Sequence, residues 1–161
     1  MRVLGIDPGI GRMGWGIVEG NGNRIKPIAF DCFETSSKLM VPERLDAIYK
    51  EVNRLIKEYS PDCLSIEDLF FQNNAKTAFV VGQARGVVLL SASQGKLPIS
   101  VYTPLQVKMA VTGYGRAEKA QVGKMIKTLL VLKEVPKPDD TADALAVALC
   151  HIFSGKISKL T

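Results

Sequence analysis

The sequence lacks long apolar runs, and its 161 residues include only one histidine, one tryptophan and three cysteines. A membrane-spanning helix needs about 20 consecutive, mostly apolar residues, so we expect no membrane segment. Asp7 is an acid where a secretory signal would have its apolar centre, which predicts that the protein is not secreted. Cys32, Cys63 and Cys150 are odd in number and far apart. We therefore expect reduced core thiols in a cytoplasmic protein, and neither a disulfide framework nor a zinc site.

The composition is typical of an ordered globular protein, because 47% of the residues are hydrophobic. The length predicts one domain, which we place at residues 1–155, followed by a short tail over 156–161. The 21 basic and 16 acidic residues give a net charge of +5. This excess favours an anionic partner such as nucleic acid, although an enzyme that binds no polyanion can carry the same charge.

The periodicity of the apolar residues predicts five strands and five helices. The expected strands are 2–7, 13–19, 24–35, 62–67 and 98–103, and the expected helices are 42–59, 76–94, a short one from Thr103-Pro104, 117–132 and 140–153. Asn21-Gly22 is typical of a tight hairpin turn, and Pro27 indicates an irregularity or an edge in the third strand. Three strands followed by strand–helix alternation predict an α/β fold, with one mixed five-stranded sheet and helices on both faces.

A glycine-rich segment, Gly9–Gly14, matches the G-x-G-x-x-G pattern of dinucleotide-binding sites. Such a site needs a helix directly after the pattern, so that the pyrophosphate meets the helix N-terminus. Here Gly14 and Gly16 lie on either side of Trp15, a spacing that disfavours a helix. No Lys-Ser/Thr pair follows to complete a phosphate loop. We therefore interpret the segment as a turn between paired strands and expect no nucleotide cofactor.

Four acids lie at the ends of predicted elements. Asp7 ends the first strand, Glu67 ends the fourth, and Asp140 and Asp143 share a face at the start of the last helix. Functional groups in open α/β sheets gather at such strand ends and helix termini. Each acid alone also fits a structural role, as a turn former, a surface acid or a helix cap. Glu67 fits that role least, because the residues around it are apolar and a buried carboxylate needs a partner.

If the four carboxylates converge, they carry a charge of −4, which two divalent cations neutralise. Oxygen ligands without histidine or cysteine favour Mg²⁺, with Mn²⁺ as a substitute. A pair of such ions is typical of phosphodiester hydrolysis. With these four acids set aside, 12 acids remain against 21 bases. An acidic metal pocket on an otherwise basic surface is typical of a nuclease.

Six stretches follow one another along the chain: Leu4-Gly-Ile-Asp-Pro-Gly9, Ile66-Glu67 followed by Phe70, Gly82-Gln-Ala-Arg-Gly86, Gln106-Val-Lys108, Ala117-Glu-Lys119 and Asp140-Thr-Ala-Asp-Ala-Leu-Ala146. In this order they resemble the RuvC family of Holliday-junction resolvases. The resemblance implies an RNase H-like fold and a homodimer that uses Mg²⁺ to nick two strands of like polarity symmetrically at a four-way DNA junction, in recombination and repair. It also implies a branch-migration complex as a partner.

Position by position, the resemblance implies four metal-binding catalytic acids, one DNA-binding aromatic residue and two DNA-binding lysines: Asp7, Glu67, Asp140 and Asp143; Phe70; Lys108 and Lys119. An aromatic side chain in a polar loop is suited to stacking on an unpaired base, but Phe70 and its neighbour Phe71 also fit a core role. The role of Phe71 is left open. The two lysines flank a Gly-Tyr-Gly loop and suit phosphate binding, or they are solvated helix residues.

The predicted helix 76–94 is apolar on nearly every side and needs cover on every side. Ala78, Gly82 and Gly86 form a smooth stripe at a spacing of four residues. We expect the sheet to cover one side and the same helix of a second copy to cover this stripe. Burial against other helices of the same domain is the alternative. His151 is interpreted as structural or surface, without a catalytic role.

Two other functions stay open at this point. Gly5-Ile-Asp7 followed by a glycine hairpin also opens the phosphate sites of sugar kinases and actin-like ATPases. Those sites need a second such domain, for which 161 residues leave no room, and detectable ATP binding would support this alternative. A non-catalytic junction-binding module is the other alternative, and it predicts no metal-dependent cutting.

Overall fold

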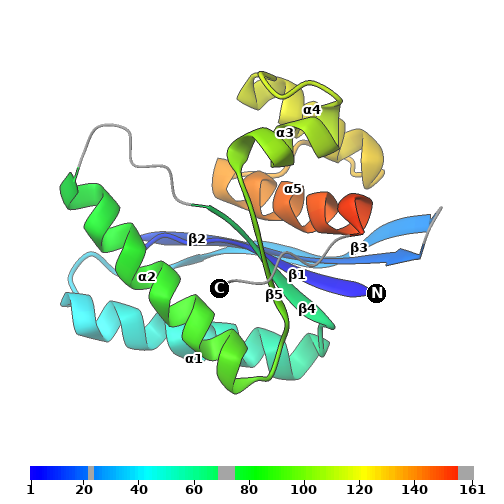
Figure 1. The fold of residues 1–161 in the computed structure, drawn as a ribbon. Helices are drawn as coiled ribbons and strands as arrows, with labels where there is room; N and C mark the ends of the chain where they lie inside the picture. Colours follow the sequence, from blue (N-terminus) through cyan, green and yellow to red (C-terminus); the bar gives the residue numbers. More distant parts are fainter. Residues whose placement is uncertain (22–23, 69–74, 156–161) are drawn as a thin grey trace.

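The described residues form one five-stranded sheet with the order β3-β2-β1-β4-β5 (Figure 1). The structure is a computed structural model, and it describes residues 1–21, 24–68 and 75–155. The strands are β1 (Arg2–Asp7), β2 (Arg12–Asn21), β3 (Arg24–Glu34), β4 (Cys63–Glu67) and β5 (Ile99–Tyr102). β2 is antiparallel to both β1 and β3, whereas β4 is parallel to both β1 and β5. The mixed sheet predicted from the sequence is confirmed.

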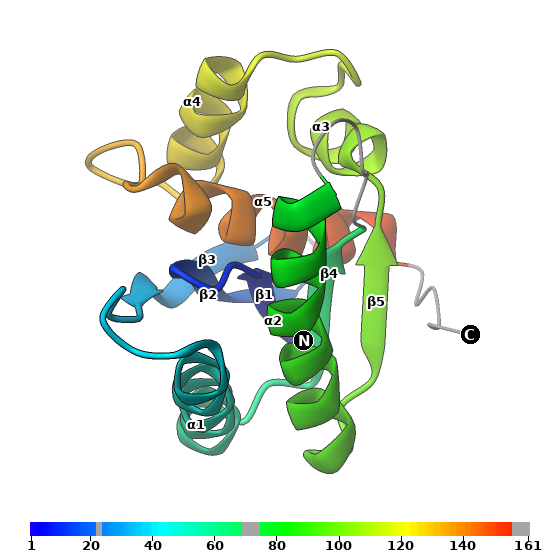
Figure 2. The ribbon, with the colours of Figure 1, turned by 90° about the vertical axis from the view of Figure 1, so that its left-hand side faces the viewer.

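Helices cover both faces of this sheet, as predicted. α1 and α2 lie on one face, and α5 lies on the other with α3 and α4 stacked outside it (Figures 1 and 2). The helices are α1 (Val41–Tyr59), α2 (Ala75–Gln94), α3 (Pro104–Thr112), α4 (Lys119–Leu129) and α5 (Asp139–Ser154). None of the helices in the described ranges combines the length and apolar character needed to cross a membrane.

The element bounds differ from the expected ones mainly at β2 and α4. β2 is longer than predicted, and the prediction of a helix over 117–132 is wrong at both ends. At the start, the backbone N–H of Glu118 donates to the side chain of Gln121 at 2.9 Å, which caps the helix. At the end, Val131 has a φ of 53°, in the left-handed region that a helix cannot continue through.

Two local predictions about the first strands are confirmed. The β2–β3 register shifts where Val18 pairs with Pro27 and Ile17 with Ala29, which leaves the irregularity expected near the proline. The glycine-rich segment after β1 leads directly into β2 instead of a helix, so the dinucleotide pattern has no helix N-terminus to present. The predicted turn at Asn21-Gly22 extends beyond the described residues.

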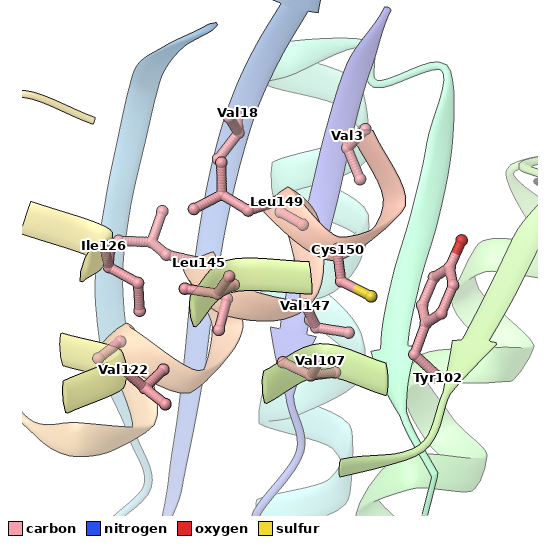
Figure 3. Packing of buried hydrophobic residues seen from close by; sticks show 14 of the residues in the cluster. Val3, Val18, Tyr102, Val107, Val122, Ile126, Leu145, Val147, Leu149 and Cys150 are labelled. Atoms are coloured by element: carbon pink, nitrogen blue, oxygen red, sulfur yellow. The ribbon is translucent and has the colours of Figure 1, made fainter. Parts of the chain in front are cut away.

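The core on the α5 face fixes that helix over the middle of the sheet. Val3 and Val18 are register partners on β1 and β2, and both side chains belong to the same buried cluster as Leu145 and Leu149 of α5 (Figure 3). Ile126 of α4 extends this cluster outward (Figure 3). Burial of such side chains is the main force that holds a helix to a sheet.

The three cysteines are free thiols, as expected. Cys63 and Cys150 are buried, and burial raises the pKa of both thiols to about 11. Cys32, however, is only partly buried on β3, because β3 is an edge strand. The expectation that all three are core residues is therefore wrong for Cys32.

Candidate active site

Two of the four predicted acids end neighbouring parallel strands and point to the same face. Successive side chains of a strand alternate between the two faces of a sheet. In β1, Leu4 and Ile6 belong to the core cluster on the α1 and α2 side, which turns Asp7 toward α5. In β4, the Ser65 hydroxyl donates to a carbonyl of α5 at 2.9 Å, so Glu67, two residues later, also faces α5.

The other two acids come from the first turns of α5, which lies unusually close to the sheet. A β-carbon at Gly14 would lie 1.9 Å from the carbonyl oxygen of Asp140. One at Gly5 would lie 2.1 Å from the carbonyl oxygen of Ala144. Distances this short do not occur between real atoms, so only glycine permits the contact. The glycines thereby let the N-terminal turns of α5, with Asp140 and Asp143, approach the strand ends.

The four acids interact electrostatically. Burial, followed by the charges of the other three acids, raises the pKa of Asp7 to about 7. Burial, followed by the charge of Asp143, raises the pKa of Glu67 to about 7. The site therefore holds more negative charge than its own cations neutralise, and this favours a divalent cation. The structure brings the predicted acids together, and their role as metal ligands stays a prediction.

Basic side chains reach the carboxylates of α5 from two sides. Nζ of Lys119 lies 3.1 Å from Oδ2 of Asp143 and 3.5 Å from Oδ2 of Asp139. Nε of Arg12, at the start of β2, lies 3.7 Å from Oδ2 of Asp140. The α5 carboxylates are thus paired with cations of the protein itself. Within the described ranges, no group of three or more histidine, cysteine or acidic side chains is arranged so that it could hold a metal ion.

The chemistry of the predicted ligands nevertheless fits a hard divalent cation, because all four are carboxylates. Two cysteines lie near enough to interact with them: besides burial, the charge of Asp140 raises the pKa of the Cys32 thiol, and that of Glu67 raises the pKa of the Cys150 thiol. A recess of about 290 Å³ opens beside Glu67 and Asp143, and Lys108 and Lys119 line it. The charges of these two lysines lower the pKa of Glu67, against the larger effect of burial and of Asp143. Both predicted DNA-binding lysines therefore lie at the acid site.

The structure does not place all of the other predicted residues. Phe70 and Phe71 fall outside the described residues. The stripe of Ala78, Gly82 and Gly86 lies on α2, and a β-carbon at either glycine would meet no atom of the described residues within 4 Å. His151 is buried, and its Nδ1 lies 2.8 Å from the Tyr102 hydroxyl. This position matches the structural interpretation of His151 rather than the surface one.

Sequence reasoning missed Arg12, Asp139 and the close packing at Gly14. Arg12 lies within the glycine-rich segment that we examined only for a nucleotide site. Asp139 directly precedes Asp140, and this position in the sequence already indicates that it lies near the site. The contact at Gly14 depends on which helix lies above it, and the local sequence carries no sign of that.

The chain is similar to proteins of one known family. The family model described as "Crossover junction endodeoxyribonuclease RuvC" matches residues 3–151. The curated protein of that name from Alkaliphilus oremlandii is 53% identical over 160 residues, which cover 99% of this chain and 98% of the relative. Two solved structures of Thermus thermophilus RuvC are also similar. One is 38% identical with a TM-score of 0.88 and covers 96% of this chain and 95% of its own. The other, in complex with a Holliday junction substrate, is 37% identical with a TM-score of 0.92. This match covers 96% of this chain and 94% of the chain of that structure.

The fold is RNase H-like, and the matched proteins are nucleases. Matches of this identity over nearly the whole chain show more than a common fold. The chain belongs to the RuvC family of crossover junction endodeoxyribonucleases. The resemblance inferred from the sequence is thus confirmed, and the alternative of an ATPase fragment is set aside.

Proposed function

We propose that this chain is a Holliday-junction resolvase, an endonuclease that nicks two strands of like polarity symmetrically at a four-way DNA junction during recombination and repair. The observation that carries the proposal is the convergence of four acids from β1, β4 and α5 near the carboxyl ends of β1 and β4. The family membership of the chain supports the substrate class. A solved relative is bound to a Holliday junction.

Asp7, Glu67, Asp140 and Asp143 would hold two Mg²⁺ ions, for which Mn²⁺ would substitute. When bound, these ions supply the Lewis acidity that favours attack of water on a phosphodiester and stabilises the leaving oxygen. The chain's own contribution is placement. The ends of β1 and β4 place two of the carboxylates on the α5 face, and the packing of α5 on glycine brings the other two close to them.

Lys108 and Lys119 would bind the DNA backbone beside the acids. Lys119 is 62% exposed even though it pairs with Asp143, so its ammonium group can reach an incoming phosphate. A phosphate there would compete with the ion pair, which links DNA binding to release of the Asp143 carboxylate. Phe70 would contact bases at the junction by stacking, a role that rests on the resemblance alone.

A homodimer would explain the apolar surface of α2. The helix buries one side in the core, but Phe79 is 70% exposed and Leu90 is 52% exposed. Ala78, Gly82 and Gly86 leave a shallow surface beside these residues, which permits close approach of a second helix. A dimer with a two-fold axis would carry one acid site in each copy, and each site would make one of the two symmetric nicks.

The rest of the proposal concerns context. Residues 1–155 would act as one nuclease domain, without a nucleotide cofactor or membrane attachment. The curated relatives come from bacteria such as Alkaliphilus oremlandii, whose DNA lies in the cytoplasm, so we place the activity there. A branch-migration complex would be a further partner, and this also rests on the resemblance.

The direct test is incubation of a synthetic four-way junction with the protein in Mg²⁺, in Ca²⁺ and in EDTA, with a linear duplex of the same sequence as the control substrate. We expect paired nicks at symmetric positions in Mg²⁺ alone, and none in the linear duplex. Binding of the junction without nicking in all three conditions would instead identify a non-catalytic junction-binding module and would refute the proposal.

A further inference from the structure

The position of Glu67 depends on the residue that follows it. Glu67 is the last residue of β4, and the β1–β4 pairing ends one residue earlier at Ile66. On the other side, Glu67 pairs with Tyr102 of β5. The next residue, Asp68, donates its backbone N–H to the carbonyl oxygen of Tyr102 at 2.7 Å. Whatever holds Asp68 therefore also limits the motion of Glu67.

The side chain of Asp68 lies near Arg85 of α2. Nη2 of Arg85 lies 3.8 Å from Oδ1 of Asp68. The Arg85 side chain is only 15% exposed, while that of Asp68 is 49% exposed. Nε of Arg85 is buried and has no hydrogen-bond partner among the residues that the structure describes. A guanidinium this buried depends on a nearby carboxylate to compensate its lost hydration, so the pair with Asp68 constrains both side chains.

The burial of Arg85 argues against direct contact with DNA. A side chain that is only 15% exposed offers little surface to a DNA phosphate, unlike Lys119 on the other side of the site, whose side chain is 62% exposed. Arg85 instead connects the residue next to Glu67 to the middle of α2.

We propose that Arg85 is a positioning residue for the cleavage reaction. It acts through Asp68 to fix the end of β4, and hence the carboxylate of Glu67, relative to the acids of β1 and α5. This inference rests on the proposed function, in which Glu67 is one of the metal-holding acids. Arginine suits the role better than lysine, because its planar group meets a carboxylate in a fixed orientation.

The test is a double-mutant cycle with Arg85→Met, Asp68→Asn and the double variant. Three properties are measured: the single-turnover cleavage rate at saturating junction and Mg²⁺, junction affinity in Ca²⁺, and Mn²⁺ affinity of the DNA-free protein by electron paramagnetic resonance. Partners of metal ligands typically affect metal affinity or activity about 10- to 100-fold. We expect such a loss of rate and a weaker Mn²⁺ affinity in each single variant, with junction affinity within about twofold of wild type.

The double variant decides whether the two residues act as one unit. If they do, its cleavage rate is no lower than that of the slower of the two single variants. Rate losses that multiply, or junction affinity that falls as much as the rate, would overturn the proposal. The ion pair between Arg54 and Glu58 on the surface of α1 supplies the control. If only the pair next to Glu67 matters, Arg54→Met and Glu58→Gln change neither the cleavage rate nor the Mn²⁺ affinity.

Two further comparisons keep the outcome clear. Asp68→Asn keeps the size of a half-exposed side chain, so it tests the proposal even if Arg85→Met unfolds the protein. If the Asp68→Asn variant binds Mn²⁺ with the same affinity as wild type, the positioning role is overturned. If wild type binds Mn²⁺ but nicks no junction, the proposed function fails instead, while the effect of the pair on Mn²⁺ affinity still tests the positioning of Glu67.

Discussion

The backbone of Asp140 lies directly against Gly14: a β-carbon at position 14 would be 1.9 Å from the Asp140 carbonyl oxygen. Gly14 is the register partner of Asp7 across β1 and β2. One glycine therefore connects an acid of the sheet with an acid of α5, and it sets how closely the two can approach. The site depends on this packing as much as on the carboxylates themselves.

Gly14→Ala should displace the first turn of α5. The added methyl group meets backbone, which cannot rotate away, so we expect the free energy of unfolding to fall by about 1–3 kcal/mol. Cleavage of the junction should fall with it, because two acids move. Chemical denaturation and a cleavage assay measure both effects. Gly11→Ala is the matched control, since among the described residues its β-carbon would meet only a side-chain atom, Nη2 of Arg44 at 3.3 Å, and no backbone. A Gly14→Ala variant as stable and active as Gly11→Ala would refute the packing argument.

The sequence predicts the sheet and its acids well, because both depend on local patterns. Alternation along β1 and β4 places Asp7 and Glu67 on one face, and the helical spacing of Asp140 and Asp143 places them together. Pro27 marks the irregularity in β3 for an equally local reason, since it lacks a backbone donor.

The parts that could not be predicted are contacts between distant segments. Gly14 was interpreted through its own conformational freedom, whereas its role is to admit a helix more than a hundred residues away in the chain. The pairing of Arg12 with Asp140, and that of Arg85 with Asp68, have the same origin. Neither partner carries a local pattern that names the other.

Asp7→Asn should separate cutting from binding. Asp7 lies centrally among the acids, so its loss should reduce the cleavage rate by roughly a thousandfold or more. Junction affinity in EDTA should stay the same or increase, because one negative charge that faces DNA is removed. A cleavage assay and an electrophoretic mobility assay measure the two effects. Asp46→Asn, at an exposed acid of α1, is the control. Equal losses of binding and cutting would contradict the account.

His151 should titrate below the usual histidine range. Burial lowers the pKa of its ring from the ordinary value of 6.5. Because the chain has a single histidine, an NMR titration of the imidazole protons assigns the pKa without ambiguity. A midpoint at or above 6.5 in the folded protein would show that the ring is not held neutral beside Tyr102.

The same shift predicts a pH dependence of stability. The folded state resists protonation of His151, so the unfolded state gains the proton first as the pH falls through 6.5, and this contribution to stability is lost toward acid. Asp7 and Glu67 act oppositely, because their pKa values are raised to about 7. The relevant measure is therefore the difference in unfolding free energy between wild type and His151→Phe, which should shrink from pH 7.5 to 5.5. A constant difference would contradict the prediction.

Gly82→Gln should weaken the proposed dimer and leave the fold intact. Gly82 has open space around its β-carbon position, and glutamine favours a helix more than glycine does. A second helix laid on the stripe, however, would meet the new side chain. We expect the dimer dissociation constant, measured by sedimentation equilibrium, to rise roughly tenfold or more. Lys57→Gln on α1 is the control. An unchanged dimer would place the interface on another surface.

The central claim is that the four carboxylates act together as one divalent-cation site, and the most direct test counts the ions. Mn²⁺ is titrated into the protein bound to a junction with non-cleavable linkages at the cutting positions, and electron paramagnetic resonance measures the free ion, with the junction alone subtracted. The account predicts two Mn²⁺ ions per protomer in wild type and in Asp46→Asn, and at most one in Asp7→Asn. An Asp7→Asn protein that binds Mn²⁺ with the stoichiometry and affinity of wild type would contradict it.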